Sequence, residues 1–173
     1  MGYSVQAFGG AVTETFTTAE VNAGAGYDLG SLRFQTPAEN VAANATHFGP
    51  KVWVWVYNDE ASTAFAEGDL ISIDTGDYAP YHGILSAAAA TPAGALLGVA
   101  GHASAAGSYG GIVKEGICEC KGDGSVAQGE AIVSHTSHQV DTMASDEEEA
   151  VIGVALEADG SAGDLFTCKV FIP

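Results

Sequence analysis

The residues best suited to metal chemistry are two histidines in the segment Ser134-His135-Thr136-Ser137-His138-Gln139. Imidazole nitrogens bind zinc and nickel, and histidines three residues apart lie on one face of a helix. This segment follows an apolar run typical of a strand, where alternation places His135 and His138 on opposite faces. No cysteine or acidic residue at ligand spacing stands beside them, so we expect no metal site and no cofactor.

Three further segments contain residue types used in catalysis or ligand binding. His102 and Ser104 are close in sequence, but a catalytic triad also needs an acid that orients the base. The acidic run 146–149 lacks the alternating ligands and central glycine of a calcium loop, which favours a solvated turn. The glycines of 24–30 lack the spacing of a dinucleotide loop. We therefore predict that the protein is not an enzyme.

The three cysteines are Cys118, Cys120 and Cys168. An odd number of cysteines, in a chain whose first residues do not read as an export signal, favours free thiols over a disulfide framework. Cys118 and Cys120 point the same way if their segment is a strand. We expect all three to be small buried side chains, reduced in protein made in a cytoplasm.

The charge balance excludes several kinds of partner. Five basic residues against 22 acidic ones give a net charge of −17. Such a surface repels nucleic acid and anionic lipid, and a single arginine leaves no basic stripe for phosphates. No stretch is long and apolar enough to predict a membrane span. The sequence therefore predicts a soluble protein that binds neither nucleic acid nor membrane.

The clearest strand is the segment 51–57, Lys-Val-Trp-Val-Trp-Val-Tyr. Its β-branched residues occupy one face and its aromatic residues the other. A strand that is apolar on both faces must be covered on both, by a second layer or by a neighbouring subunit. Trp53, Trp55 and Tyr57 are therefore candidate interface anchors, and a purely internal core is the alternative.

Residues 1–50 differ from the rest of the chain. They place isolated aromatic residues in a background of Gly, Ala, Thr and Asn, and no helical or strand period persists apart from a short helical turn expected near Thr18. This composition predicts an extended N-terminal arm that buries Phe8, Phe16 and Phe34 on a neighbouring molecule. The alternative is a loop-rich first part of the same domain, which otherwise spans 51–173.

The chain after residue 64 contains two similar copies, about 65–118 and 126–172. Two strings recur in the same order, each beside an apolar run: a hydrophobe-Ala-polar-Gly-acid string and a Gly-Val-Ala string, in segments 65–72 and 126–133 and in segments 97–100 and 152–155. The predicted fold is mainly β, a barrel or sandwich built from a duplicated strand-loop-strand unit with an extended N-terminal arm.

The order and spacing of these strings resemble those of small tailed-phage head decoration (cement) proteins, over residues 65–173. The resemblance implies a structural virion protein on the outer capsid surface, made in the host cytoplasm. It implies a homotrimer whose partner is the major capsid protein and whose task is to stabilise the shell. The family has no catalytic residues to transfer to this chain.

Two other functions are consistent with the sequence. One is a different virion part, such as a head fibre base, a tail component or a host-adhesion module. The other is a small trimeric metal-binding β-barrel enzyme that uses His102, His135 and His138.

Overall fold

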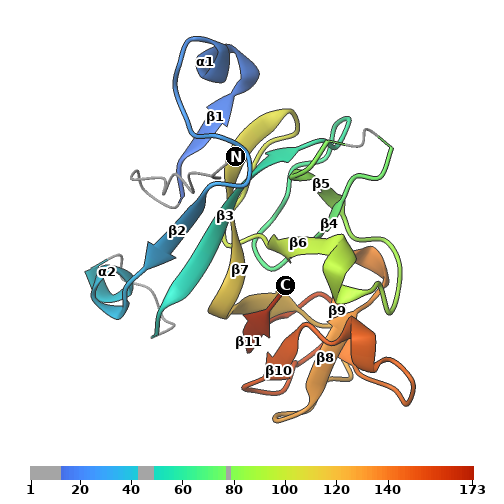
Figure 1. Ribbon diagram of the computed structural model, residues 1–173. Helices are drawn as coiled ribbons and strands as arrows, with labels where there is room; N and C mark the ends of the chain where they lie inside the picture. The colour runs from blue at the N-terminus through green and yellow to red at the C-terminus, as the bar shows by residue number, and fades with distance from the viewer. Residues whose placement is uncertain (1–12, 43–48, 77–78) are drawn as a thin grey trace.

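A computed structural model describes residues 13–42, 49–76 and 79–173. These residues form an eleven-stranded sheet with short helices at its margins (Figure 1). The strands are β1 Thr15–Thr17, β2 Leu32–Gln35, β3 Lys51–Asn58, β4 Leu70–Ile73, β5 His82–Leu85, β6 Leu96–Val99, β7 Ser108–Lys121, β8 Ala131–Ser134, β9 Val140–Thr142, β10 Gly153–Ala155 and β11 Leu165–Phe171. The α-helices are α1 Thr18–Asn22 and α2 Pro37–Ala42, and the 3₁₀ turns are Ala93–Ala95, Thr136–His138 and Glu148–Ala150. No helix among the described residues is long and apolar enough to cross a membrane.

The first half of the repeat region closes a small barrel with β3. The strands pair in the order β3, β5, β4, β6, β7, and β7 returns to pair with β3. Within this ring β3 and β5 are parallel, while the other neighbours are antiparallel. The mainly β prediction is confirmed, and a closed five-stranded barrel is the form that it takes.

The second half continues from the later residues of β7, where Glu115 to Lys121 pair with β11. There the order is β7, β11, β10, β8, β9, so the run β10, β8, β9 beside β11 repeats the run β6, β4, β5 beside β7. A parallel bridge from Gly122 to Val140 brings β9 back to the end of β7. The repeat suggested that the two copies close one barrel together, but the closed barrel contains strands of the first copy and β3 only. Because β7 is 14 residues long, it serves both halves.

Matching residues of the two copies make matching hydrogen bonds. The amide of Gly68 donates to the carbonyl of Ala100 at 2.8 Å, and that of Gly129 donates to Ala155 at 2.9 Å. Both glycines have positive φ, 82° and 89°, which a residue with a Cβ adopts only at a cost. The recurring Gly-acid string thus marks the same tight turn before β4 and before β8.

Strand β3 is covered on both faces by its own chain. Trp53 and Trp55 pack in one core cluster, while Val54 and Val56 pack in another. Trp53 is 4% exposed and Trp55 is fully buried. The structure therefore corrects the suggestion that these two tryptophans are exposed interface anchors: they are core residues. The cover that the sequence required comes from this subunit itself.

Part of that cover comes from the segment expected to be an arm. The ring of Phe16 lies 5.9 Å from that of Trp55, and the ring of Tyr27 meets it edge-on at 5.2 Å. Strand β1 pairs with β7 and strand β2 pairs with β3. Residues 13–42 are therefore a loop-rich part of the same domain and not an extended arm, because they pair with its strands and cover the ring of Trp55. Residues 1–12, with Phe8, lie outside the described residues.

Helix α1 forms where the sequence predicted a helical turn. Thr17 is the N-cap, and its hydroxyl accepts a hydrogen bond from the amide of Glu20 at 3.3 Å. The carboxylate of Glu20 accepts in return from the amide of Thr17 at 2.7 Å. This reciprocal capping box satisfies amides at the start of a five-residue helix that is too short to be stable by itself.

Candidate functional site

The exposed large hydrophobic side chains define one face of the sheet. We call it the outer face: the solvent side of β2, β3, β7, β11 and β10. By strand alternation it carries Phe34, Val52, Glu115, Ile117, Glu119, Lys121, Val154, Leu156, Leu165, Thr167, Lys169 and Phe171. The inward positions of the same strands, such as Cys168 and Val170, are fully buried. Burial therefore fixes which side of each strand remains available to a partner.

One row of side chains crosses four strands of this face. Phe34 on β2 lies opposite Val52 on β3, Val52 lies opposite Glu115 on β7, and Glu115 lies opposite Phe171 on β11. Phe34 is 61% exposed and Phe171 is 45% exposed. Two phenylalanines that are 137 positions apart in the chain thus belong to one continuous surface, because antiparallel pairing aligns them.

The lower part of the outer face adds two leucines. Leu165 is 43% exposed and lies opposite Lys121, and Leu156, which is 37% exposed, donates its amide to the carbonyl of Thr167 at 2.9 Å. All four exposed large hydrophobic residues among those described are therefore on the outer face. Scattered exposed leucines are ordinary in monomers, but their gathering on one face marks a contact surface.

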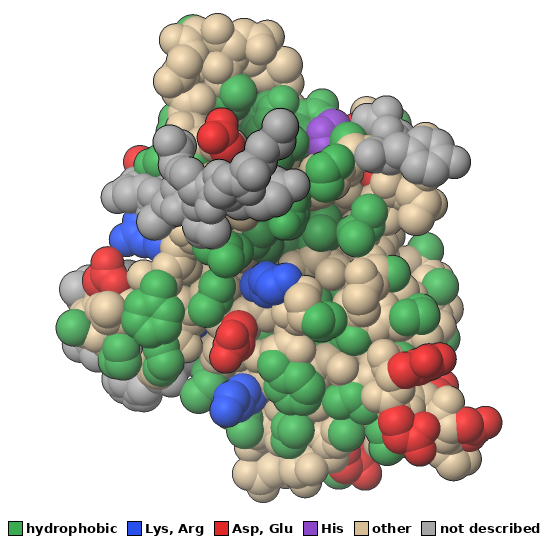
Figure 2. Space-filling view, in the orientation of Figure 1, with side chains coloured by type: hydrophobic (Ala, Val, Ile, Leu, Met, Phe, Trp, Pro, Cys, Tyr) green, Lys and Arg blue, Asp and Glu red, His purple; other side chains and the backbone are tan. Residues whose placement is uncertain are grey.

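Charges are mixed among these hydrophobic residues. Lys121 and Lys169 are two of the five basic residues of the chain; Lys121 shares β7 with Glu115 and Glu119, and Lys169 stands on the neighbouring strand β11. The Nζ of Lys121 lies 2.5 Å from Oδ1 of Asp69, a carboxylate that is almost completely buried. Figure 2 shows hydrophobic, basic and acidic side chains intermixed over the region of β2, β3, β7 and β11. The outer face is therefore less acidic than the chain as a whole.

The three thiols lie directly beneath the outer face. Cys118 and Cys168 are opposite each other on β7 and β11, and all three cysteines are free and buried. Hydrogen bonding with the thiols of Cys118 and Cys168, together with burial, raises the pKa of the Cys120 thiol well above its ordinary value. The three cysteines are therefore small buried side chains that pack in the core, as the sequence predicted.

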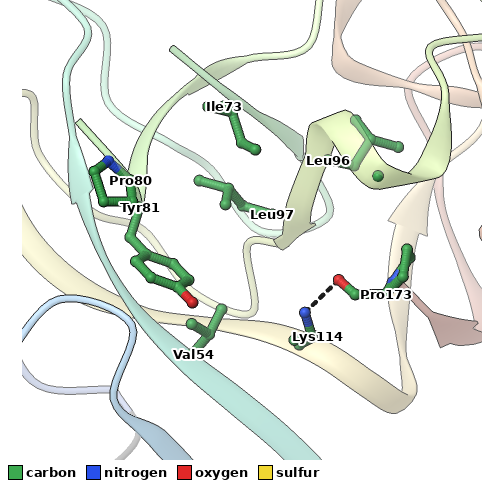
Figure 3. Close-up of a pocket in the computed structure, with 9 residues that line it drawn as sticks. Val54, Ile73, Pro80, Tyr81, Leu96, Leu97, Lys114 and Pro173 are labelled. Atoms are coloured by element: carbon green, nitrogen blue, oxygen red, sulfur yellow. Dashed lines mark hydrogen bonds between the residues drawn. The ribbon is translucent and has the colours of Figure 1, made fainter. Parts of the chain in front are cut away.

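A separate pocket of about 250 Å³ opens on the first barrel (Figure 3). Its wall is mostly apolar, with Val54, Tyr81 and Leu97 among the lining residues. The one charged side chain of this lining, Lys114, donates from Nζ to an oxygen of Pro173. Desolvation lowers the pKa of Lys114. Since Lys114 already has a partner, the pocket offers a ligand mainly shape and apolar contact.

The interface residues predicted from the sequence lie in different places and differ in exposure. Phe34 lies on the outer face, whereas Phe16 packs on Trp55 and Tyr57 is half-buried with its ring 4.8 Å from that of Tyr109. Leu165 and Phe171 were missed, although the alternation of β11 carried the signal. With 166, 168, 170 and 172 facing inward, the odd-numbered positions 165 and 171 had to face solvent.

The histidines are dispersed. His102 lies in the turn after β6, and its Nδ1 is 3.0 Å from the carbonyl of Ala103. His135 directly follows β8 and lies in space beside Asp123 and Asp141, two acids that are not its neighbours in sequence. His138 lies in the 3₁₀ turn and donates its amide to the carbonyl of Ser86 at 2.8 Å. The three do not form one site.

Comparison with known proteins places the chain. The family model described as phage cement protein matches residues 77–172, more than half of the chain. The head fibre N base of bacteriophage phi29 has a similar fold, with a TM-score of 0.50 and 14% sequence identity over 68% of this chain and 92% of that one. No curated protein matches by sequence. The chain belongs to the phage cement protein family and is a structural protein of the phage virion.

Proposed function

We propose that this protein decorates the outside of a phage capsid, binds the major capsid protein through the outer face, and stabilises the shell. The observation that carries the proposal is that all four exposed large hydrophobic residues described lie on that face, in a member of the cement family. A hydrophobic centre with charged residues among and around it has the composition of a protein interface.

The rest of the surface suits the outside of a particle. The acidic run 146–149 lies in the loop after β9, where Figure 2 shows red side chains gathered away from the outer face. Acidic surfaces that face solvent make neighbouring phage particles repel one another. The mixed charges of the outer face lessen repulsion where the protein contacts the capsid. An acidic protein can therefore bind the capsid through the outer face even though its overall charge is strongly negative.

The proposal includes a homotrimer. Among the described residues β2 pairs on one side only, with β3, so its other edge can pair with a neighbouring copy. Three linked copies bind a shell with high effective concentration, so each contact can be modest. A trimer that bridges several capsid subunits adds buried area across the joints that open first when a shell is strained. Phe34 remains a proposed contact residue as part of the outer face, and Phe16 and Tyr57 can contribute only the part of their surface that their own subunit leaves uncovered.

The experiment uses phage heads stripped of this protein and then incubated with purified wild-type protein or variants. Bound protein is measured after sedimentation of the heads, and the temperature at which the heads release their DNA is recorded. We expect wild-type protein to raise that temperature. Phe171→Ser should bind at least about fivefold more weakly, and the double variant with Leu165→Ser more weakly still, because truncation of central hydrophobic anchors costs about 1 kcal/mol or more each.

Glu148→Ser is the matched control, because Glu148 is exposed in the acidic loop and off the outer face. It should bind as the wild type does. Equal binding by Phe171→Ser, or heads that break at the same temperature with and without bound protein, would refute the proposed face in the first case and the stabilising role in the second.

A second candidate function is the base of a head fibre, which the similarity to the phi29 head fibre base favours at the level of fold. Copy number separates the two functions. Gel densitometry of purified particles against the major capsid protein should give a stoichiometry that matches the capsomers for a decoration protein. A much lower stoichiometry would favour the fibre base.

A further inference from the structure

Three side chains in the second half of the protein converge on one point. Asp123, His135 and Asp141 each present one possible ligand atom, and these atoms all lie within 4.8 Å of one another. All three residues are half-buried. Asp123 follows β7, His135 follows β8 and Asp141 is in β9, so three separate segments contribute.

Backbone pairing holds these segments in place. The bridge between Gly122 and Val140 sets Asp123 beside β9, and the amide of Asp123 donates to the carbonyl of Val140 at 3.1 Å. The amide of His135 donates to the carbonyl of Gln139 at 2.8 Å, which closes the turn between β8 and β9. The three side chains are therefore brought together by the sheet itself and not by a mobile loop.

In each of the two aspartates, one carboxylate oxygen, Oδ1, accepts hydrogen bonds from neighbouring groups. Oδ1 of Asp123 accepts from the amide of Ser125 at 2.9 Å, and Oδ1 of Asp141 accepts from the amide of Thr142 at 2.6 Å. The hydroxyl of Ser125 lies 2.7 Å from the first oxygen and 2.9 Å from the second. Since a hydroxyl has one proton, it can donate to only one of them at a time.

The site has an excess of negative charge. Within the described part of the chain, Oδ2 of neither aspartate accepts a hydrogen bond, and no lysine or arginine forms an ion pair with either residue. The first half of the protein offers a contrast at the end of β3, where one carboxylate meets one imidazole: Asp59 Oδ2 and His82 Nδ1 are 2.9 Å apart. The second half sets two carboxylates beside one imidazole.

We propose that Asp123, His135 and Asp141 bind one divalent transition-metal ion, with Zn²⁺ as the best fit. One imidazole and two carboxylates are a mixed nitrogen and oxygen set, which suits zinc and its first-row neighbours better than calcium or magnesium. Three protein ligands leave a fourth position for water. The ion would neutralise the two carboxylates and tie the loop after β7 to the turn after β8.

The test is calorimetric titration of ZnCl₂ into the full chain after treatment with EDTA and dialysis, with MgCl₂ as the comparison ion. We expect one zinc ion per chain and a higher unfolding temperature in its presence, because a ligand that binds only the folded state stabilises it. Asp141→Asn and His135→Gln should each weaken zinc binding about tenfold or more. Asparagine keeps an oxygen for the amide of Thr142, so Asp141→Asn should fold as the wild type does in EDTA.

Asp146→Asn is the matched control. It removes one charge from the exposed acidic run of the same half, at a position of positive φ that asparagine tolerates. Zinc binding should be unchanged in it. The proposal is overturned if zinc does not bind, if Asp141→Asn and His135→Gln bind as tightly as the wild type, or if Asp146→Asn weakens binding equally. Capsid binding is a separate measurement and depends on the outer face, so the two proposals can fail independently.

Discussion

Gly98 on β6 and Gly153 on β10 face the same obstacle in the two halves of the protein. A Cβ on Gly98 would lie 2.5 Å from the carbonyl oxygen of Val113, and a Cβ on Gly153 would lie 2.4 Å from that of Lys169. Both distances are far below contact, and both obstacles are backbone atoms that cannot rotate away. The glycine of the recurring Gly-Val-Ala string therefore lets β6 lie close to the backbone of β7, and β10 close to that of β11.

Substitution of these glycines should destabilise the fold. Gly98→Ala and Gly153→Ala each force two backbones apart, and we expect each to lower the free energy of unfolding by about 1–3 kcal/mol. Urea denaturation followed by tryptophan fluorescence measures the change. Gly94→Ala is the control, since no atom lies within 4 Å of its Cβ position and its change should stay within about 1 kcal/mol. Equal effects at 94 and 98 would contradict the close-approach argument.

Glu130 should stabilise the fold at neutral pH and lose that effect in acid. Hydrogen bonds from the Thr142 hydroxyl and the Ala127 amide lower the pKa of Glu130 below its ordinary value. A lowered pKa contributes stability above the ordinary value that disappears as pH falls through the folded-state value. The unfolding temperatures of wild type and Glu130→Gln should therefore differ at about pH 7 and converge in acid. A constant difference across the range would contradict this.

The thiol cluster predicts sensitivity to alkali. The raised pKa of Cys120 means that an unfolded chain loses this proton first, so the stability gained by keeping the thiol neutral is present below the ordinary pKa and is lost as pH rises through the folded-state value. Stability should fall as pH rises above the ordinary thiol pKa of about 8.5, and less steeply in Cys120→Ala. A thiol reagent should label the native protein only as fast as it unfolds; rapid labelling would show an accessible thiol.

The N-terminal segment should be required for stability. Tyr27→Ala removes the ring that packs edge-on against Trp55, and we expect a loss of about 1–3 kcal/mol. Phe34→Ser is the comparison because its ring is largely exposed, so stability should change by less than about 0.5 kcal/mol. Deletion of residues 1–35 would uncover Trp53 and Trp55 and should abolish cooperative unfolding. A stable, soluble deletion variant would restore the arm interpretation.

Much of the fold could be predicted from local patterns. The Gly-acid strings at 68–69 and 129–130 marked equivalent turns, and the alternation in β11 identified its buried face. The cover of Trp55 could not be predicted, because Phe16 and Tyr27 reach it through the pairing of β1 and β2 with strands far along the chain. Sequence showed only that a cover was necessary.

The sites illustrate the same limit. Phe34 and Phe171 share a row because of three successive strand registers, none of which is encoded near either residue. Likewise, Asp123 meets His135 and Asp141 through one bridge at Gly122, so the acids that approach His135 are not those near it in sequence. Non-local pairing determines both surfaces, and a single sequence contains no direct record of it.

Because β7 pairs with strands of both halves, one copy of the repeated sequence does not correspond to one independently folding unit. A repeat copied as a stretch of sequence usually gives two bodies that can be separated with a cut between them. Here a cut between the copies separates β7 from β11, and each fragment would present a bare strand edge to other molecules in solution. Neither half can therefore complete its sheet without the other, and mechanical strain applied to one half passes to the other through the pairing of β7 with β11.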